Sequence, residues 1–168
     1  IVREPRTTEL WEGHLSGKGT AIGIIPINEN NSCKWGCIDV DTYPLDHKKL
    51  VDKIRAAKIP MVVCRSKSGG AHCFLFTKDW VTAKEMQDVL THIAAALSYA
   101  GSEIFPKQIR LELDRGDTGN FLNTPYYDAE DGLRYAILDD GSAATIQEFF
   151  KLYEQYALTP EELSSLVI

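Results

Sequence analysis

Hydrophobic and polar positions follow two different periods along this chain, which predicts a domain built from both strands and helices. Short apolar runs, several rich in β-branched residues, predict strands at 20–25, 33–41, 61–65, 71–76, 103–105, 120–123 and 134–138. Apolar residues spaced three or four positions apart, or flanking cap residues, predict helices at 7–14, 45–58, 82–99, 145–156 and 160–168. The turn at 66–70 joins two apolar strands, so part of the sheet is antiparallel. The pattern therefore predicts an α/β or α+β fold.

Length and composition favour one soluble domain covering residues 1–168, with 145–168 as a helical tail. The chain has 168 residues, of which 44% are hydrophobic and 25% charged. No apolar run is long enough to span a membrane. The sequence starts at Ile1 without an initiator Met and stops inside a predicted helix. We therefore expect it to be a segment of a longer chain.

Charge is distributed unevenly, which bears on nucleic-acid binding. The net charge is −6, and the segment from Asp128 onward carries nine acidic residues against two basic ones. The remainder is nearly neutral, and a local basic groove is sufficient for phosphate contacts. We expect the acidic end to face away from any nucleic acid. The four cysteines lack zinc-site spacing and are typical of reduced, buried thiols in a cytoplasmic protein.

The first candidate site is the acidic pair Asp39 and Asp41. Residues i and i+2 of a strand point to the same face, so both carboxylates project together while Ile38 and Val40 are buried. Two adjacent carboxylates repel each other unless a cation lies between them, and Mg²⁺ or Mn²⁺ prefers such oxygen ligands. A pair of ions can bind the attacking and leaving oxygens of a phosphoryl transfer. Taken alone, Asp-x-Asp also suits a solvated strand end, but the preceding Trp35–Ile38 is apolar and favours a core strand.

The second candidate site is the Gly-rich turn that follows. Glycines allow backbone N–H groups to turn toward an anion, and hydroxyl and ammonium groups add further donors. We expect this turn to bind a triphosphate, through Ser66, Lys67, Ser68, Gly69, Gly70 and His72. The alternative is a tight hairpin in which the glycines serve only geometry.

A third acid and two polar helpers complete the expected site. Glu103 precedes Phe105 on a short strand and is a candidate third metal ligand. Lys107 and Asn120 are secondary candidates for contacting the triphosphate. Taken singly, Glu103 also suits a surface position and Asn120 suits turn chemistry. The rivals for the third acid are Glu112, Asp114 and Asp117, which lie in a charged loop that holds a metal ligand poorly.

Taken together, these motifs resemble the archaeo-eukaryotic primase superfamily, and most closely the primase domain of bacterial TOTE-type conflict systems. Five ordered motifs carry the likeness: 14–18, 35 with the acidic pair, 66–72, 103–108 and 119–126. Thr124 stands where that family typically has Leu, and the family's third acid is often Asp where this chain has Glu103. The resemblance implies an α+β primase-polymerase domain with an RRM-like antiparallel sheet carrying the three acids.

The resemblance also implies an activity and its partners. It implies synthesis of RNA or DNA from nucleoside triphosphates on a single-stranded DNA template with a primer, in a bacterial or phage-encoded protein. It implies a two-metal site of Mg²⁺ or Mn²⁺ on Asp39, Asp41 and Glu103, and helicase or nuclease modules elsewhere in the full chain.

Two alternatives remain open: a metal-dependent phosphodiesterase or nuclease using the same acids, and a non-catalytic RRM-like module that binds nucleic acid. An RRM stacks bases on exposed sheet aromatics. The expectation of acids rather than aromatics on this sheet face argues against the binding module.

Overall fold

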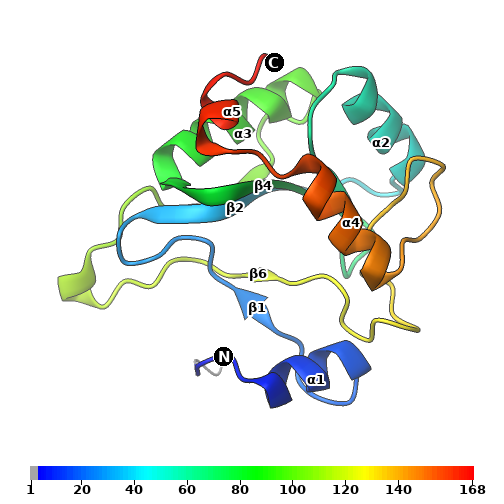
Figure 1. The fold of residues 1–168 in the computed structure, drawn as a ribbon, viewed down its shortest axis with the longest axis horizontal. Helices are drawn as coiled ribbons and strands as arrows, with labels where there is room; N and C mark the ends of the chain where they lie inside the picture. The colour runs from blue at the N-terminus through cyan, green and yellow to red at the C-terminus, as the bar shows by residue number, and fades with distance from the viewer. Residues whose placement is uncertain (1–3) are drawn as a thin grey trace.

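The protein folds around a four-stranded antiparallel sheet with the strand order β3-β4-β2-β5 (Figure 1). A computed structural model describes residues 4–168. The sheet strands are β2 (Ser32–Val40), β3 (Val62–Arg65), β4 (Ala71–Thr82) and β5 (Glu103–Phe105). A separate two-stranded ribbon pairs β1 (Gly23–Ile24) with β6 (Leu122–Asn123). The prediction of a mixed fold with antiparallel pairing is confirmed.

One face of the sheet is covered by α2 (His47–Ala56), α3 (Ala83–Ala96) and α5 (Pro160–Ser164) (Figure 1). The alternation predicted for β2 holds here, because Ile38 and Val40 are buried in this layer. The helices contribute a continuous apolar stripe, made of Leu50, Val51, Ile54, Met86, Leu90 and Ile93. Each helix starts at a side-chain cap, for example Thr82 accepting from the backbone N–H of Glu85.

The opposite face of the sheet is turned toward the β1–β6 ribbon, α1 (Thr8–Ser16) and α4 (Ile146–Tyr156) (Figure 1). The aromatic and aliphatic side chains of α4 pack against this face, through Ile146, Phe149, Leu152 and Tyr156. The apolar stripe of α4 therefore places part of the acidic C-terminal segment on the sheet face that carries Asp39. The expectation that the acidic end faces away from any nucleic acid stays a prediction.

Several predicted strands are shorter than the apolar runs suggested. The run 20–25 forms only the two residues of β1, and 120–123 forms only β6. The run 134–138 forms isolated bridges, although Arg65 donates its backbone N–H to Tyr135 and Ile137 donates to Val63. This segment therefore extends the edge of β3 without becoming a regular strand. The cysteines are free and buried, as predicted, and burial raises the pKa of Cys73 to about 12. None of the described helices is long and apolar enough to cross a membrane.

The N-terminal helix is tied to the rest of the domain by the fully buried His14. Its Nδ1 accepts from the N–H of Ile22, and its Nε2 donates to the carbonyl of Pro125 at 2.8 Å. This pattern requires the neutral ring. Burial lowers the pKa of His14, opposed in part by the hydrogen bond to Pro125.

We predict that His14 makes the domain acid-sensitive below its ordinary pKa of about 6.5. Because the folded pKa is the lower one, the unfolded chain binds the proton more tightly, and the free energy of unfolding falls as pH drops from about 6.5 toward the folded pKa. Denaturant titrations at several pH values between 8 and 5 give the free energy of unfolding, which should fall less with decreasing pH for His14→Gln than for the wild type. The exposed His92→Gln is the control, and equal slopes in all three proteins would contradict this role.

Candidate active site

The register of the sheet brings Asp39, His72 and Glu103 into one row. Asp39 on β2 lies directly opposite His72 on β4 and directly opposite Glu103 on β5. Directly opposed residues of an antiparallel pair point to the same face, with Cβ atoms about 4.5–5.5 Å apart. Cys64 on β3 continues the row beyond His72. The sequence predicted these residues separately, and the strand order is what makes them neighbours.

Asp39 occupies the middle of this row and is only 19% exposed at its side chain. The Nε2 atom of His72 lies 3.5 Å from the Asp39 carboxylate. The next row along the same face is apolar, with Cys37, Phe74 and Phe105 all buried. The carboxylate is therefore fixed at the border between an apolar floor and solvent.

Asp41 lies one residue beyond the end of β2 rather than inside the strand, and it is exposed. The hydroxyl of Tyr43 donates to its carboxylate at 2.7 Å. That hydrogen bond is the main cause of the raised pKa of Tyr43, which also bonds to Ser68 of the Gly-rich turn. Tyr43 therefore links the second acid to the turn, a connection that the sequence did not predict.

Glu103 begins β5 and is about half exposed. It forms an ion pair with Lys107, whose ammonium also lies over the ring of Phe105 at 5.3 Å. Lys107 thus neutralises the third acid in this structure. Two of the three rival acids are paired within their own loop: Glu112 with Arg110, and Asp117 with Arg115 and the N–H of Glu112, around a single 3-10 turn at Leu113–Arg115.

The carboxylate row fits a divalent ion in the type of its ligands, although it is not already gathered around one point. Within residues 4–168, no three His, Cys, Asp or Glu side chains converge closely enough to hold a metal. Asp39 and Glu103 are cross-strand neighbours, however, and carboxylate oxygens are the preferred ligands of Mg²⁺ and Mn²⁺. Lys107 would have to leave Glu103 for an ion to be shared.

The Gly-rich turn forms the β3–β4 hairpin and is packed against the end of β2. Ser66 donates its N–H to the Gly70 carbonyl at 3.1 Å, and Gly69 donates back to Ser66 at 3.0 Å. Gly69 has a φ of +97°, which favours glycine. A Cβ on Gly70 would lie 2.3 Å from the Val40 carbonyl oxygen, so this position allows no side chain without movement. Lys67 and Ser68 remain exposed at the tip.

His47, at the start of α2, was not predicted to take part in this site. Its Nε2 donates to the carbonyl of Gly70 at 2.9 Å. Asp46 caps the same helix by accepting from the N–H of Lys49. The sequence signal was limited to a His beside a helix start. Its contact with a residue 23 positions away depends on the fold.

A small basic hollow opens beside His72. Its lining combines residues of the β3–β4 hairpin with two distant segments: Cys64, Arg65, Ser66, Lys67, His72, Asn123, Thr124, Pro125 and Arg134. Arg134 was missed from the sequence, where it is one of only two bases in the acidic C-terminal part. Its Nη1 is buried and finds no hydrogen-bond partner among the described residues. Burial also lowers the pKa of its guanidinium.

Asn120 is grouped differently from the other predicted triphosphate contacts. Its side chain accepts from the amide of Gln108, and its N–H donates to Gln108 at 3.1 Å. Asn123, two residues later, lines the basic hollow instead. Asn120 therefore fastens the loop after β5, and Asn123 is the amide that lies beside His72.

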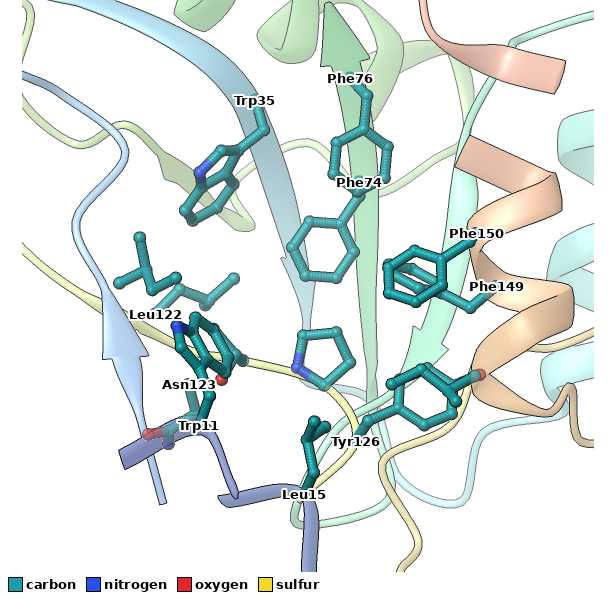
Figure 2. Close-up of a pocket in the computed structure, with 14 residues that line it drawn as sticks. Trp11, Leu15, Trp35, Phe74, Phe76, Leu122, Asn123, Tyr126, Phe149 and Phe150 are labelled. Carbon is teal, nitrogen blue, oxygen red and sulfur yellow. The ribbon is translucent and has the colours of Figure 1, made fainter. Parts of the chain in front are cut away.

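A larger cavity of about 410 Å³ adjoins the same sheet face (Figure 2). Aromatic rings from four elements surround it, including Trp11, Trp35, Phe74, Phe76, Phe149 and Phe150. The expectation of acids rather than aromatics on this face is therefore wrong. The face carries both, with acids at one end of β2 and β4 and aromatics farther along the same strands.

The structure places carboxylates beside a Gly-rich hairpin on an antiparallel sheet, and the family match that follows supports a nucleotidyltransferase-type function for such a domain. Residues 3–162 match the family model described as the archaeo-eukaryotic primase domain of TOTE conflict systems. The match spans nearly the whole chain, and the chain belongs to this family. The resemblance stated from the sequence is thereby confirmed. A comparison with curated proteins gives no match.

Proposed function

We propose that this domain is a template-directed nucleotidyltransferase that adds nucleoside triphosphates to a 3′-hydroxyl on single-stranded DNA. The observation that carries the proposal is the cross-strand row Glu103–Asp39–His72, which ends beside the Gly-rich hairpin. A polymerising site needs acidic groups that can hold metal ions next to groups that donate hydrogen bonds to a triphosphate. In this row the carboxylates of Glu103 and Asp39 lie beside the imidazole of His72. Membership of the primase family supports the same reading.

In the proposed reaction the 3′-hydroxyl oxygen bonds to the α-phosphorus, the bond from that phosphorus to the β-bridging oxygen breaks, and pyrophosphate leaves. The hydroxyl proton passes to solvent. Asp39, Asp41 and Glu103 would hold Mg²⁺ or Mn²⁺, and the chemistry supplied by such ions is activation of the hydroxyl and neutralisation of phosphate charge. Lys67, Ser66 and His72 donate toward the β- and γ-phosphates.

The proposal is tested by the length of a labelled strand. The protein is incubated with a single-stranded template, a labelled primer, nucleoside triphosphates and Mg²⁺ or Mn²⁺. We expect the wild type to lengthen the primer and Asp39→Ala/Asp41→Ala to leave it unchanged. The matched control is Asp114→Ala/Asp117→Ala in the charged loop, which should extend normally. Equal extension by the wild type and the first double variant would remove the assignment.

The second candidate, a metal-dependent nuclease, is distinguished by Lys67. Lys67 is exposed at the hairpin tip, so removing its side chain should not unfold the protein. We predict that Lys67→Ala weakens nucleoside triphosphate use about 10- to 100-fold, mainly through KM, because one charge-assisted contact is worth about 1.5–3 kcal/mol. The control Lys84→Ala alters an exposed residue of α3 and should have no effect. Strand shortening that is unaffected by Lys67→Ala would favour the nuclease instead.

A further inference from the structure

The aromatic cavity and the basic hollow are adjacent subsites that share one wall. Asn123, Thr124 and Pro125 line both of them. The two are also neighbours on β4, since the ring of His72, which lines the hollow, meets the ring of Phe74, which lines the cavity, edge to face with centroids 6.2 Å apart. A basic hollow beside an aromatic cavity is complementary to a nucleotide, which carries phosphates at one end and a flat aromatic base at the other.

We infer that the cavity binds the nucleobase of a nucleoside triphosphate whose phosphates lie over the mouth of the basic hollow, which itself encloses only about 10 Å³, and that it does so without a template. This inference rests on the proposed function and adds the base subsite to it. The volume of about 410 Å³ falls within the range of about 300–1,000 Å³ typical of small-molecule sites. Phe74 follows His72 by two residues of β4, or about 7 Å, so base and phosphates would be held on one strand.

The aromatic lining is suited to a flat ring. Phe74 and Phe76 lie nearly parallel, with an interplanar angle of 12° and centroids 5.6 Å apart. Trp35 is tilted by 60° against Phe74 and closes the cavity on the β2 side (Figure 2). Bases stack on such rings whatever their sequence, because every base presents a π-face.

Asn123 supplies a polar contact for the edge of the base. Its amide offers two donor hydrogens and a carbonyl acceptor, which can match the polar edge of any base. Asn123 is exposed, and within the described part of the chain no side chain bonds to that amide. Arg134, which lines only the basic hollow, holds a buried Nη1 that likewise lacks a hydrogen-bond partner among residues 4–168. Both groups line the basic hollow. They would therefore lie close to the point where a bound nucleotide passes from the hollow to the cavity.

The chain offers a direct spectroscopic test, because two of its three tryptophans line the cavity. Trp80 is the third, is 51% exposed and does not line the cavity, so Trp80→Phe leaves only Trp11 and Trp35 as reporters. In this background, ATP without template should quench the fluorescence, and inorganic tripolyphosphate should bind without the same quenching. We expect ATP to bind at least about tenfold more tightly than tripolyphosphate.

Phe150, an exposed residue that lines the aromatic cavity, is the first position to vary in this test. It is 55% exposed, so Phe150→Ala should fold, and Leu113→Ala, at equal exposure in the charged loop, is its control. Phe150→Ala and Asn123→Ala should each reduce the advantage of ATP over tripolyphosphate several-fold, whereas Leu113→Ala should not. Equal affinities for ATP and tripolyphosphate, or an unchanged ATP affinity in both cavity variants, would overturn the inference.

Its failure is separable from that of the proposed function. Normal primer extension combined with no preference for ATP would remove the base subsite alone. Tight ATP binding in the cavity combined with no extension would remove the polymerase assignment alone. Quenching by single-stranded DNA that depends on Phe150, with none by ATP, would assign the cavity to a strand base and also overturn the inference.

Discussion

Asp39→Asn should lower the rate of nucleotide incorporation by about 10³-fold or more while leaving the fold intact. The substitution keeps the size of the side chain but removes the charge at the centre of the row between Glu103 and His72. Losing several kcal/mol of stabilisation of the reacting phosphate corresponds to a reduction of this size. Single-turnover incorporation rates measure the loss, and thermal unfolding checks the fold.

The matched control is Asp114→Asn, which removes an equal charge from the exposed loop. It should incorporate nucleotides at the wild-type rate. An Asp39→Asn protein that retained more than about a tenth of wild-type activity would show that this carboxylate holds no essential ion. Raising the Mn²⁺ concentration should recover little, because a neutral amide is a weaker ligand than a carboxylate.

Gly70→Ala should both destabilise the protein and impair triphosphate use. The new Cβ would lie 2.3 Å from the Val40 carbonyl oxygen, so either the hairpin or the end of β2 must move. Overpacking of this kind costs about 1–3 kcal/mol. Because Val40 directly precedes Asp41, the movement separates the second acid from the turn. Denaturant titration measures the stability, and KM for nucleoside triphosphate measures the site.

The control is Gly101→Ala, which introduces backbone strain without displacing a neighbouring atom. Gly101 has a φ of +90°, and a Cβ there meets no atom within 4 Å. It should lose about 1–2 kcal/mol of stability through backbone strain alone, with an unchanged KM. If Gly70→Ala behaved in the same way, the packing of the hairpin against β2 would have no role in binding.

The local elements of this fold could be predicted from the sequence because their signals are local. The alternation around Ile38 and Val40 located β2, and the glycines between two apolar runs located the β3–β4 hairpin. The candidate acids Asp39 and Asp41 and the Gly-rich turn could be identified from these same segments. The apolar spacing of 82–99 was also sufficient to predict α3.

The arrangement of the site could not be predicted, because it depends on register between distant strands. Nothing in the sequence determines that Glu103 lies opposite Asp39, or that β5 pairs with β2 rather than with β3. The same applies to Arg134, which reaches the hairpin only because its segment runs beside β3. Phe74 and Phe76 of β4 likewise form the wall of a cavity only because α4 and β6 pack beside them.

Anomalous diffraction from crystals soaked in Mn²⁺ and a non-hydrolysable nucleoside triphosphate would show whether Asp39 and its neighbouring carboxylates hold a divalent ion. We predict a manganese peak bound to oxygens of Asp39 and Asp41, with Lys107 released from Glu103 and Glu103 turned toward the ion. A peak on Asp39 and Asp41 alone would remove Glu103 from the site. A nucleotide bound at the hairpin with no manganese on Asp39 would show that these carboxylates hold no ion in the reaction.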